Sequence, residues 1–361
     1  MGAILSRFGP WILLLLAAVV PLSFASGYQL FQLTMVAVYA LAILGFNLVT
    51  GYNGQISLGH GAFFAVGAYV TAVLMDHWGV PYWATLPASA VVCAAVGFLI
   101  GLPALRLGGL YLALTTFALA VAIPQLLKYD AFEDWTGGVQ GVVLDKPDAP
   151  FGLPLNGDQW IYLFTLAVAA AFFVLGRNLV RGRIGLAMMA IRDHPLAAES
   201  MGINLAMFKT RTFAVGAMFT GVAGSLGAIA VQFVSPDSYS VFLSISLFVG
   251  LIAGGVASIP GPIFGAFFIV FVPNLAEGVS KAAPAAVYGV ILIAFMFLMP
   301  SGIWGFVRGR IRRLLAAPDR HARAPDALPQ PTPHYDVSGA DAKAVPQYAA
   351  GKPAPTPGRG A

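Results

Sequence analysis

The chain has 361 residues, of which 58% are hydrophobic and 10% are charged, and its formal net charge is +5. Soluble domains carry about a quarter charged residues, so this composition excludes an ordinary soluble protein and indicates a multi-pass membrane protein. The single cysteine, Cys93, lies in an apolar stretch, which excludes a disulfide framework and a cysteine metal site.

Apolar stretches long enough to cross roughly 30 Å of hydrocarbon recur along the chain. They lie at approximately 10–27, 29–50, 58–76, 83–105, 109–128, 160–176, 211–233, 241–257, 262–280 and 284–304. Backbone polar groups in lipid must be hydrogen-bonded internally, and the alternation typical of lipid-exposed strands does not occur. The sequence therefore predicts an all-α bundle of about 10 transmembrane helices.

The first apolar stretch has two interpretations. Arg7, the run WILLLLAAVV and the small residues before Gly27 also resemble a signal peptide that is cleaved after Ala25. We favour an uncleaved helix, because the distribution of charge over the rest of the chain fits equally well with it.

The orientation follows from where lysine and arginine fall between the spans. If the N-terminus is cytoplasmic, the inside connections carry Arg7, Arg106, Arg177, Arg181, Arg183, Arg192, Lys209, Arg211, Arg308, Arg310, Arg312 and Arg313. The outside connections carry only Lys128, Lys146 and Lys281. This asymmetry predicts that both termini are cytoplasmic and that the acidic connection 129–159 faces outward.

The composition changes after Arg313. Residues 314–361 are rich in proline, alanine and charge, with too little apolar surface to form a core. We therefore expect a transmembrane domain over 1–313 and a disordered cytoplasmic tail over 314–361.

A short sequence occurs twice in the predicted bundle. The stretch GYNGQISLGHGAFF (51–64) aligns with GVASIPGPIFGAFF (255–268), and GAFF is identical in both at a constant offset of 204. Both copies join a span that runs inward to one that runs outward, so the repeat is parallel. Parallel repeats are one way in which transporters are built.

The first copy and its counterpart supply the candidate pore residues. Two interpretations stay open: a tight turn with close helix packing, or a broken segment beside a translocation path. The candidates are Asn47, Gly51, Asn53, Gly54, Gln55, Ser57, Gly59, His60, Gly61, Gly255, Gly261 and Gly265. The stretch lacks the lysine and hydroxyl residue of a phosphate-binding loop. His60 has no histidine, cysteine or carboxylate nearby in sequence, so we expect a structural histidine rather than a metal ligand.

Charged residues are absent from the middle of every predicted span. Proton- and ion-coupled pumps commonly place such residues there as relays. The sequence therefore predicts a pore that takes its energy from another subunit.

The longest inside connection, 177–211, contains a signal for a short helix outside the bilayer. Asp193 is a suitable N-cap, Pro195 fits a first helical turn, and Gly202 fits a left-handed C-terminal position. We expect a helix over 194–201, which is too short to be stable alone. It packs either on a soluble partner or on its own bundle and the lipid headgroups.

With these features in place, the chain resembles the LivM family of permeases, the larger membrane subunits of branched-chain amino acid ABC importers. The blocks that carry the resemblance span about 30–310. They are GYNGQISLGHGAFFAVGAY (51–69), PALRLGGLYLALTTFA (103–118), TGGVQG (136–141), GRIGLAMMAIRDHPLAAESMGIN (182–204) and the stretch 250–268. Gly108 departs from the family, whose members often carry a second basic residue there.

The resemblance implies a set of partners and roles. The segment with Asp193, Pro195, Ala197, Ala198, Glu199 and Gly202 would be the coupling helix that docks on one of two cytoplasmic ATPase subunits. Those ATPases would use ATP and Mg²⁺, while this chain would carry no catalytic residue, cofactor or metal. A second homologous permease and a periplasmic binding protein would complete an importer in the bacterial inner membrane.

The substrate and the class of function keep alternatives. The resemblance implies leucine, isoleucine and valine, but related permeases are assigned to urea, short amides or aromatic acids. A stand-alone channel or secondary transporter is disfavoured by the uncharged spans and the exposed helix, and a purely structural membrane subunit is a third possibility. Nothing in the sequence indicates binding to nucleic acid.

Overall fold

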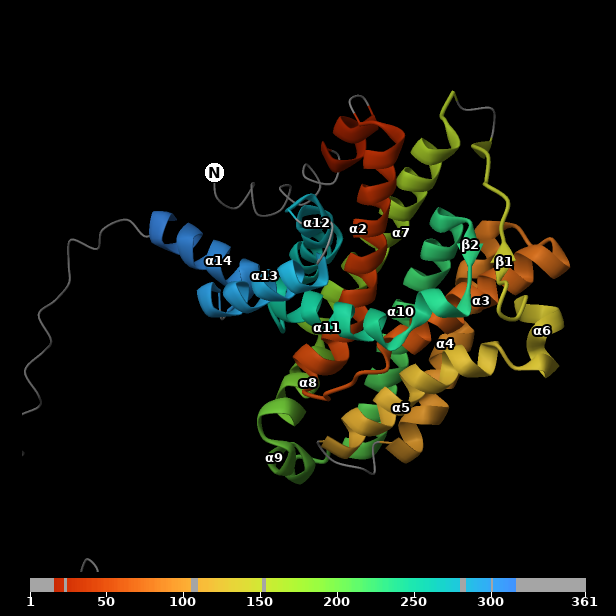
Figure 1. Cartoon of the computed structure of the whole chain (residues 1–361). Coiled ribbons are helices and arrows are strands. Elements are labelled where there is room, and N and C mark those ends of the chain that lie inside the picture. Colours follow the sequence, from red (N-terminus) through yellow and green to blue (C-terminus); the bar gives the residue numbers. More distant parts are fainter. Residues whose placement is uncertain are drawn as a thin grey trace, which may run out of the picture. The chain divides into compact units, whose positions relative to one another are not determined.

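The computed structural model describes residues 16–22, 25–104, 110–150, 154–279, 284–299 and 301–315 (Figure 1). The chain divides into two compact units, Met1–Arg313 and Leu314–Ala361, and the structure describes only the first two residues of the second unit. Its longer helices are α2 (Gly27–Phe46), α3 (His60–Trp78), α4 (Tyr82–Ala104), α5 (Leu110–Leu127), α7 (Gly157–Arg181), α10 (Leu205–Val231), α11 (Val241–Gly254), α12 (Gly261–Val279), α13 (Pro284–Leu298) and α14 (Gly302–Leu315).

Shorter elements join these helices. They are the π-helix η1 (Asn47–Tyr52), the helices α6 (Asp130–Thr136), α8 (Arg183–Asp193) and α9 (Pro195–Ser200), the 3-10 helix η3 (Pro236–Tyr239), and the strands β1 (Val142–Val143) and β2 (Phe233–Val234). The two strands form one antiparallel ribbon, in which Val142 lies opposite Val234. The sequence analysis missed this ribbon because strands of two residues leave no periodic signal.

The predicted all-α fold of a multi-pass membrane protein is confirmed. From 29–50 onward each predicted span corresponds to a helix, although the last, 284–304, extends beyond the end of α13 at Leu298 to the start of α14 at Gly302. The first span, 10–27, is described only in part, at 16–22 and 25–27. Among the described helices, 4 are long and apolar enough to cross a membrane, and α5 with α6 adds one more if that bent pair is a single span. The count of ten spans therefore stays a prediction, as do the first span's cleavage and the domain boundaries.

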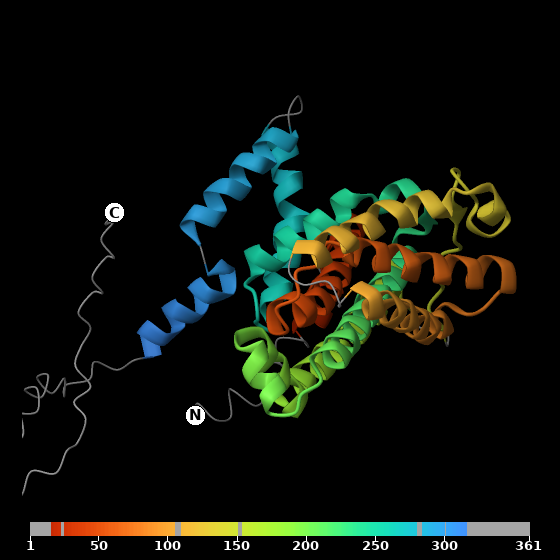
Figure 2. The same cartoon turned by 90° about the horizontal axis from the view of Figure 1, so that it is seen from below.

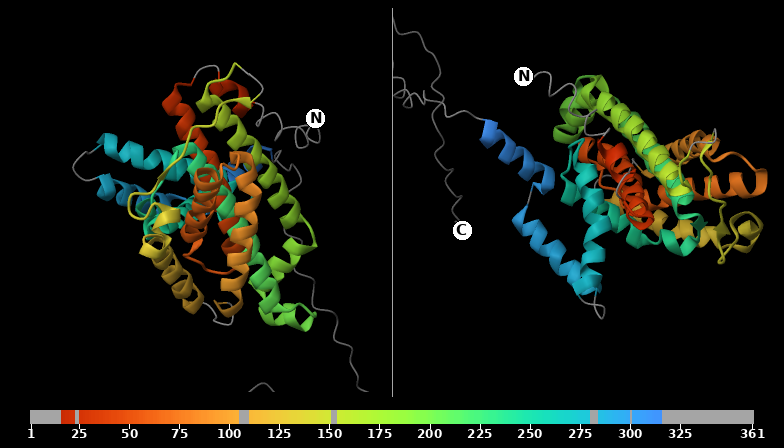
Figure 3. Two further views of the ribbon diagram at one scale, coloured as in Figure 1. Left: turned by 90° about the vertical axis from the view of Figure 1, so that its right-hand side faces the viewer. Right: turned by 90° about the horizontal axis from the view of Figure 1, so that it is seen from above.

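Helix α2 lies in the middle of the described bundle. It packs against α7, α10 and α12, and the view from above shows α7 on one side of it and α11 and α12 on the other (Figure 3). The spans of α2 and α10 are each 83% buried within the chain, whereas those of α4 and α7 are 33% and 17% buried. Helices α4 and α7 therefore leave apolar surface for lipid or for a partner chain.

Glycines allow α3 and α10 to approach each other closely. A Cβ added to Gly67 would collide with the carbonyl of Gly221, and one added to Gly224 would collide with the carbonyl of Phe64. Small residues allow the two backbones to approach. The resulting van der Waals contact stabilises the helix pair in lipid, where the hydrophobic effect does not drive helices together. Hydroxyl groups connect α10 to α3 and also to α4, because Thr71 of α3 donates to Ser225 of α10 over 2.7 Å and Ser225 lies 2.6 Å from the Ser89 oxygen of α4.

Two helix boundaries differ from the sequence prediction for local reasons. Helix α10 begins at Leu205 rather than at 211, because the Asn204 side chain accepts a hydrogen bond from the Met207 amide at 3.0 Å and caps the helix. Helix α7 continues to Arg181 rather than stopping at 176, so its last turn carries Arg177 and Arg181 beyond the apolar stretch. Apolarity locates the part of a helix inside the lipid but not its polar ends.

Candidate functional site

The junction between α2 and α3 is irregular at the stretch that the sequence analysis selected. Helix α2 widens into the π-helix η1, residues 53–59 follow without regular structure, and α3 begins at His60. Gly54 has a φ of 70°, which favours glycine. Short π-helical turns are frequent at functional sites, and irregular backbone at membrane depth requires protein cover or a water-filled cavity.

Protein covers almost all of this junction. The side chains of Asn47, Asn53, Gln55, Ser57 and His60 are at most 3% exposed. The glycines make this packing possible: a Cβ on Gly59 would lie 2.8 Å from the carbonyl oxygen of Thr116. A Cβ on Gly61 would meet Ser244 of α11, whose hydroxyl accepts a hydrogen bond from the Gly61 amide at 3.0 Å.

Asn47, at the start of the π-helix η1 that leads into the first copy of the repeat, bonds to the second copy. Its Nδ2 donates to the carbonyl oxygen of Ser258 at 2.7 Å, and its Oδ1 accepts from the amide of Ala257 at 2.9 Å. Gly51 makes room for this contact, because a Cβ there would overlap the Asn47 amide and lie 2.8 Å from the Ala257 nitrogen. Two predicted site stretches that are distant in sequence therefore form one site.

The second copy repeats the helix–loop–helix arrangement. Gly255 has a φ of 115° and Ala257 a φ of 55°, so this loop also leaves the ordinary backbone regions. A Cβ on Gly261 would lie 2.5 Å from the carbonyl of Gly255, and one on Gly265 would overlap the backbone of Gly250 in α11. The predicted glycines of this copy thus lie at close contacts of α11 with α12. Whether the two copies form a parallel repeat stays a prediction.

His60 lies among aromatic rings. It stacks on Phe46 with 4.3 Å between ring centroids, and Phe63 and Phe213 approach it edge-on at 6.2 and 6.0 Å. Its Nδ1 lies 3.2 Å from the Ser57 hydroxyl, and its buried Nε2 has no hydrogen-bond partner within the described residues. In the same part of the chain, no three histidine, cysteine, aspartate or glutamate side chains gather as metal ligands would.

Asn53 and Gln55 keep unpaired polar atoms. Gln55 Nε2 donates to the carbonyl of Lys209 at 3.2 Å, but Gln55 Oε1 and both amide atoms of Asn53 are buried without a partner among the described residues. Buried polar groups are normally hydrogen-bonded to protein or water. Water held inside the bundle would therefore complete the polar contacts of this junction.

Arg192 connects the junction to α8. Its Nη1 donates to the carbonyl oxygen of Gly51 at 3.0 Å, and its Nε donates to the carboxylate of Asp193 at 2.8 Å. Its aliphatic stem lies under the loop, because a Cβ on Gly54 would come within 2.7 Å of Arg192 Cγ. The hydrogen bond from Arg192 also lowers the pKa of Asp193. The view from below shows α8 and α9 beside the end of α2 (Figure 2).

The predicted N-cap at Asp193 is wrong. Residues 183–193 form a helix of their own, α8, and Asp193 is its last residue, where its carboxylate pairs with Arg192. The residue that precedes α9 is His194, whose side chain makes no capping hydrogen bond. Helix α8 was not predicted from the sequence, because only Gly182 separates it from α7 and no run of loop residues marks the boundary.

Helix α9 ends as its sequence predicts. Gly202 has a φ of 86°, its amide donates to the carbonyl of Glu199 at 2.9 Å, and the Ile203 amide donates to that of Ala198 at 3.1 Å. This pair of bonds is a Schellman motif, which satisfies carbonyls at the end of a helix.

Most of α9 is exposed. Pro195, Ala197, Glu199 and Gly202 are exposed, and the apolar side chains of Leu196 and Met201 are 77% and 85% exposed. Ala198 is only 4% exposed and holds α9 against its own chain.

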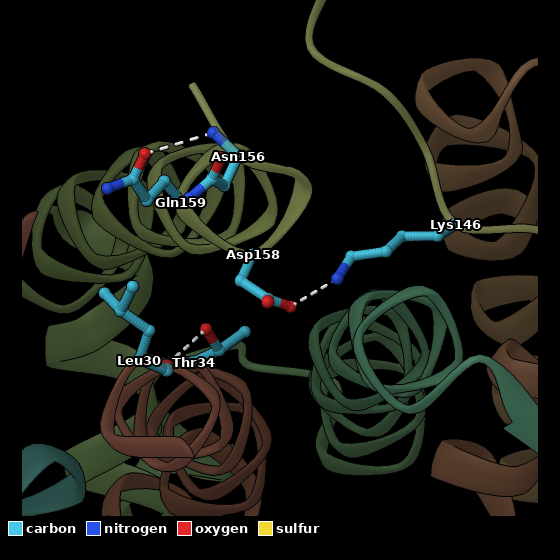
Figure 4. A network of polar contacts seen from close by, with 6 residues as sticks. All are labelled: Leu30, Thr34, Lys146, Asn156, Asp158 and Gln159. Atoms are coloured by element: carbon cyan, nitrogen blue, oxygen red, sulfur yellow. Dashed lines mark hydrogen bonds and ion pairs between the residues drawn. The ribbon is translucent and has the colours of Figure 1, made fainter. Parts of the chain in front are cut away.

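Contacts also hold described parts of the connection 129–159 to the bundle. His77 Nε2 lies 2.7 Å from the carbonyl oxygen of Asp134, and its ring stacks on Trp135. Asp158, at the start of α7, pairs with Lys146 at 2.6 Å, beside the bond from the Asn156 amide to Gln159 that caps the helix (Figure 4). These contacts tie the connection to the bundle at several points.

Comparison with known proteins gives one consistent result. The sequence profile of the family described as "Branched-chain amino acid transport system / permease component" matches residues 28–300. The chain is 30% identical to the high-affinity branched-chain amino acid transport system permease protein LivM of Escherichia coli, over 77% of this chain and 70% of that protein. The identity and coverage are the same for LivM of Salmonella typhimurium.

Other relatives bear a second name. The chain is 27% identical to the permease protein LivH of Escherichia coli, over 77% of this chain and 94% of that protein. No solved structure gives a significant match.

Proposed function

The chain belongs to the family of permease components of branched-chain amino acid transport systems, and from this premise we propose that it is the LivM-type half of an ATP-driven importer. It is a multi-pass membrane protein and carries out transport rather than a chemical reaction. A homologous permease of the LivH type supplies the second half. Two ATPase subunits, which use ATP and Mg²⁺, act on the inner side, and a binding protein delivers branched-chain amino acids from outside.

The contact between α8 and the α2–α3 junction carries this proposal. Exposed apolar side chains on α9, Leu196 and Met201, offer a surface that a soluble protein would cover. The guanidinium of Arg192 connects the neighbouring helix α8 to the last π-helical turn of the central helix α2. A displacement of α8 and α9 by an ATPase therefore reaches the core of the bundle through a direct hydrogen bond.

The energy of ATP enters as a difference in affinity. The ATPase dimer has an ATP-bound and an ATP-free state. If one of these states binds α9 more tightly, it favours the conformation of the bundle that fits it. Arg192 then moves the Gly51 carbonyl, and Asn47 passes the displacement to the loop at Ala257 and Ser258. Both copies of the repeat respond together because this side chain bonds them to each other.

The opposite side of the chain would meet the binding protein. The connection with α6 and the ribbon exposes Trp135 and Val143, which are 46% and 72% exposed, beside the acidic residues Asp130 and Glu133. Charged and aromatic side chains on an ordered loop suit a transient, steered contact. The acidic loop would pair with basic residues of that partner.

Docking and coupling can be tested separately. Replacing Leu196 with Glu places a charge on the exposed face of α9, so the ATPase should no longer co-purify while the permease stays folded. Replacing Val139 with Glu is the matched control, since Val139 is 63% exposed in the outward connection. If the ATPase binds the Leu196→Glu protein as it binds the parent, α9 is not the docking surface.

The second variant tests transmission. Arg192→Leu keeps the exposed face of α9, so the ATPase should still bind and hydrolyse ATP, while leucine uptake per ATP falls. Arg183→Leu, at the exposed start of α8, is the control for the loss of a positive charge. Unchanged uptake by the Arg192→Leu protein would refute the proposed link.

A further inference from the structure

The central helix α2 is open on one face near its N-terminus. Tyr28, Phe31, Gln32, Met35 and Tyr39 recur at helical spacing and therefore share that face. Tyr28 is 65% exposed and Phe31 38% exposed, whereas Leu30, Thr34 and Val38 on the other faces are at most 3% exposed. A helix in the middle of the bundle is thus exposed at Tyr28 and Phe31 and half-buried at Gln32, Met35 and Tyr39 along one face.

Helix α12 forms a second wall of a groove along this face. Val270 and Asn274 of α12 join the α2 side chains around a cavity of about 240 Å³. Met35 and Tyr39 also line a second cavity of about 90 Å³, whose other walls include Phe64 and Tyr239. The two cavities are therefore consecutive along α2. The first is smaller than the roughly 300–1,000 Å³ of pockets for drug-sized ligands, which suits a smaller solute.

The chemistry of the groove is polar but uncharged. The Gln32 amide donates to the Tyr28 hydroxyl at 3.1 Å, and the Asn274 amide donates to the carbonyl of Val270 at 3.0 Å. Neither amide oxygen accepts a hydrogen bond from any described residue. Polar side chains in membrane segments are costly toward lipid and face a bundle interior or a water-filled cavity instead. Gln32 and Asn274 therefore indicate a surface that lipid does not cover.

We propose that this groove between α2 and α12 is the wall that the chain contributes to the substrate path, and that a second permease closes its open side. The amide oxygens of Gln32 and Asn274 accept from the ammonium group of a zwitterionic amino acid, and the Tyr28 hydroxyl donates to its carboxylate. Phe31, Met35 and Val270 contact an aliphatic side chain. The absence of a charged residue among these groups keeps binding weak enough for release.

The assignment deepens the proposed transport function and rests on it for the identity of the substrate. It differs from the location that the sequence favoured. Asn47, Asn53, Gln55 and His60 are buried inside the chain, whereas the groove is open and lies in the opposite half of α2. The α2–α3 junction then serves as the moving joint, and the groove as the surface that the substrate touches.

Cysteine labelling in the assembled transporter tests the groove. The only cysteine is buried at position 93, so Cys93→Ser gives a background without thiols. Single Gln32→Cys and Asn274→Cys variants are then treated in membrane vesicles with a charged methanethiosulfonate reagent, with and without saturating leucine. Val91→Cys is the control, because Val91 is 69% exposed on the mid-part of α4, where we expect lipid. Thiolates react only where water and reagent reach them.

We expect Gln32→Cys and Asn274→Cys to be labelled, leucine to slow the labelling, and labelling to abolish most ATP-driven uptake, while Val91→Cys stays unlabelled. Two results overturn the proposal: both groove variants as unreactive as Val91→Cys, which shows lipid or a packed interface, or labelling that leaves uptake unchanged. A third result separates the groove from the substrate. If the groove variants are labelled, and another solute carried by the binding protein protects them while leucine does not, the groove lines the substrate path but the substrate is not a branched-chain amino acid.

Discussion

Replacement of Asn47 with alanine tests whether one buried amide holds the two copies of the repeat together. The change removes the donor to the Ser258 carbonyl and the acceptor for the Ala257 amide. Both stranded groups belong to the backbone of the 255–260 loop, which has no regular structure of its own to satisfy them. Asn47 itself is 0% exposed, so water does not replace the lost amide without entering the bundle.

The size of the effect follows from measured hydrogen bonds in membranes. Such bonds between helices contribute about 0.6 kcal/mol on average and up to about 1.7 kcal/mol. Loss of the two Asn47 bonds leaves two backbone groups unsatisfied, so values near the upper end apply to each bond. We expect the free energy of unfolding to fall by roughly 2–3 kcal/mol. Asn47→Asp keeps the acceptor but places a carboxylate next to the Ser258 carbonyl, so it should destabilise at least as much.

The assay is unfolding of the purified protein in mixed micelles with increasing SDS, which reports the free energy directly. Gln32→Ala is the control, because it removes an amide of the preceding helix α2 that is only partly buried. A loss below about 0.5 kcal/mol for Asn47→Ala, the usual scatter between independent sites, would refute the bridging role. A loss equal to that of Gln32→Ala would do the same.

Two further substitutions probe the glycines. Gly67→Ala drives a methyl group into the Gly221 backbone, so α3 and α10 must separate. We expect the free energy of unfolding to fall by about 3 kcal/mol or more in the same assay. Gly289→Ala is the control and should cause no loss, because a Cβ there meets no atom within 4 Å. Gly202→Ala meets no neighbouring atom either, but its φ of 86° remains, so we expect about 1–2 kcal/mol of local strain. Faster amide exchange confined to α9 and its flanks would show this, and an unchanged exchange rate would contradict it.

Much of the fold was accessible from the sequence because its determinants are local. Long apolar stretches without charge specify helices that cross lipid, whatever they pack against. Pro195 and Gly202 likewise mark a short helix by backbone geometry alone, and α9 lies within one residue of its predicted bounds. The resemblance of five blocks to a permease family led to the same family that the comparison of the whole chain established.

The site was accessible only in part. The sequence selected Asn47 and Gly255, but nothing local indicates that an asparagine at the end of one helix bonds a loop more than 200 residues away. It also placed Ala198 on the docking surface, whereas Ala198 is buried and the exposed apolar groups are Leu196 and Met201. Alanine is compatible with either environment, so only the packing of α9 against α10 decides between them.

The sequence by itself determined that this is a helical membrane protein of the permease family, where most of its long helices lie, and where glycine interrupts them. The tertiary structure alone decided which face of α2 is open, which residues join the two copies, and how α8 reaches the junction. The physical reason is the solvent. In lipid, an apolar side chain gains no hydrophobic free energy by turning inward. The buried and the lipid-facing sides of a spanning helix therefore have similar apolar composition, and only the packing of the helices distinguishes them.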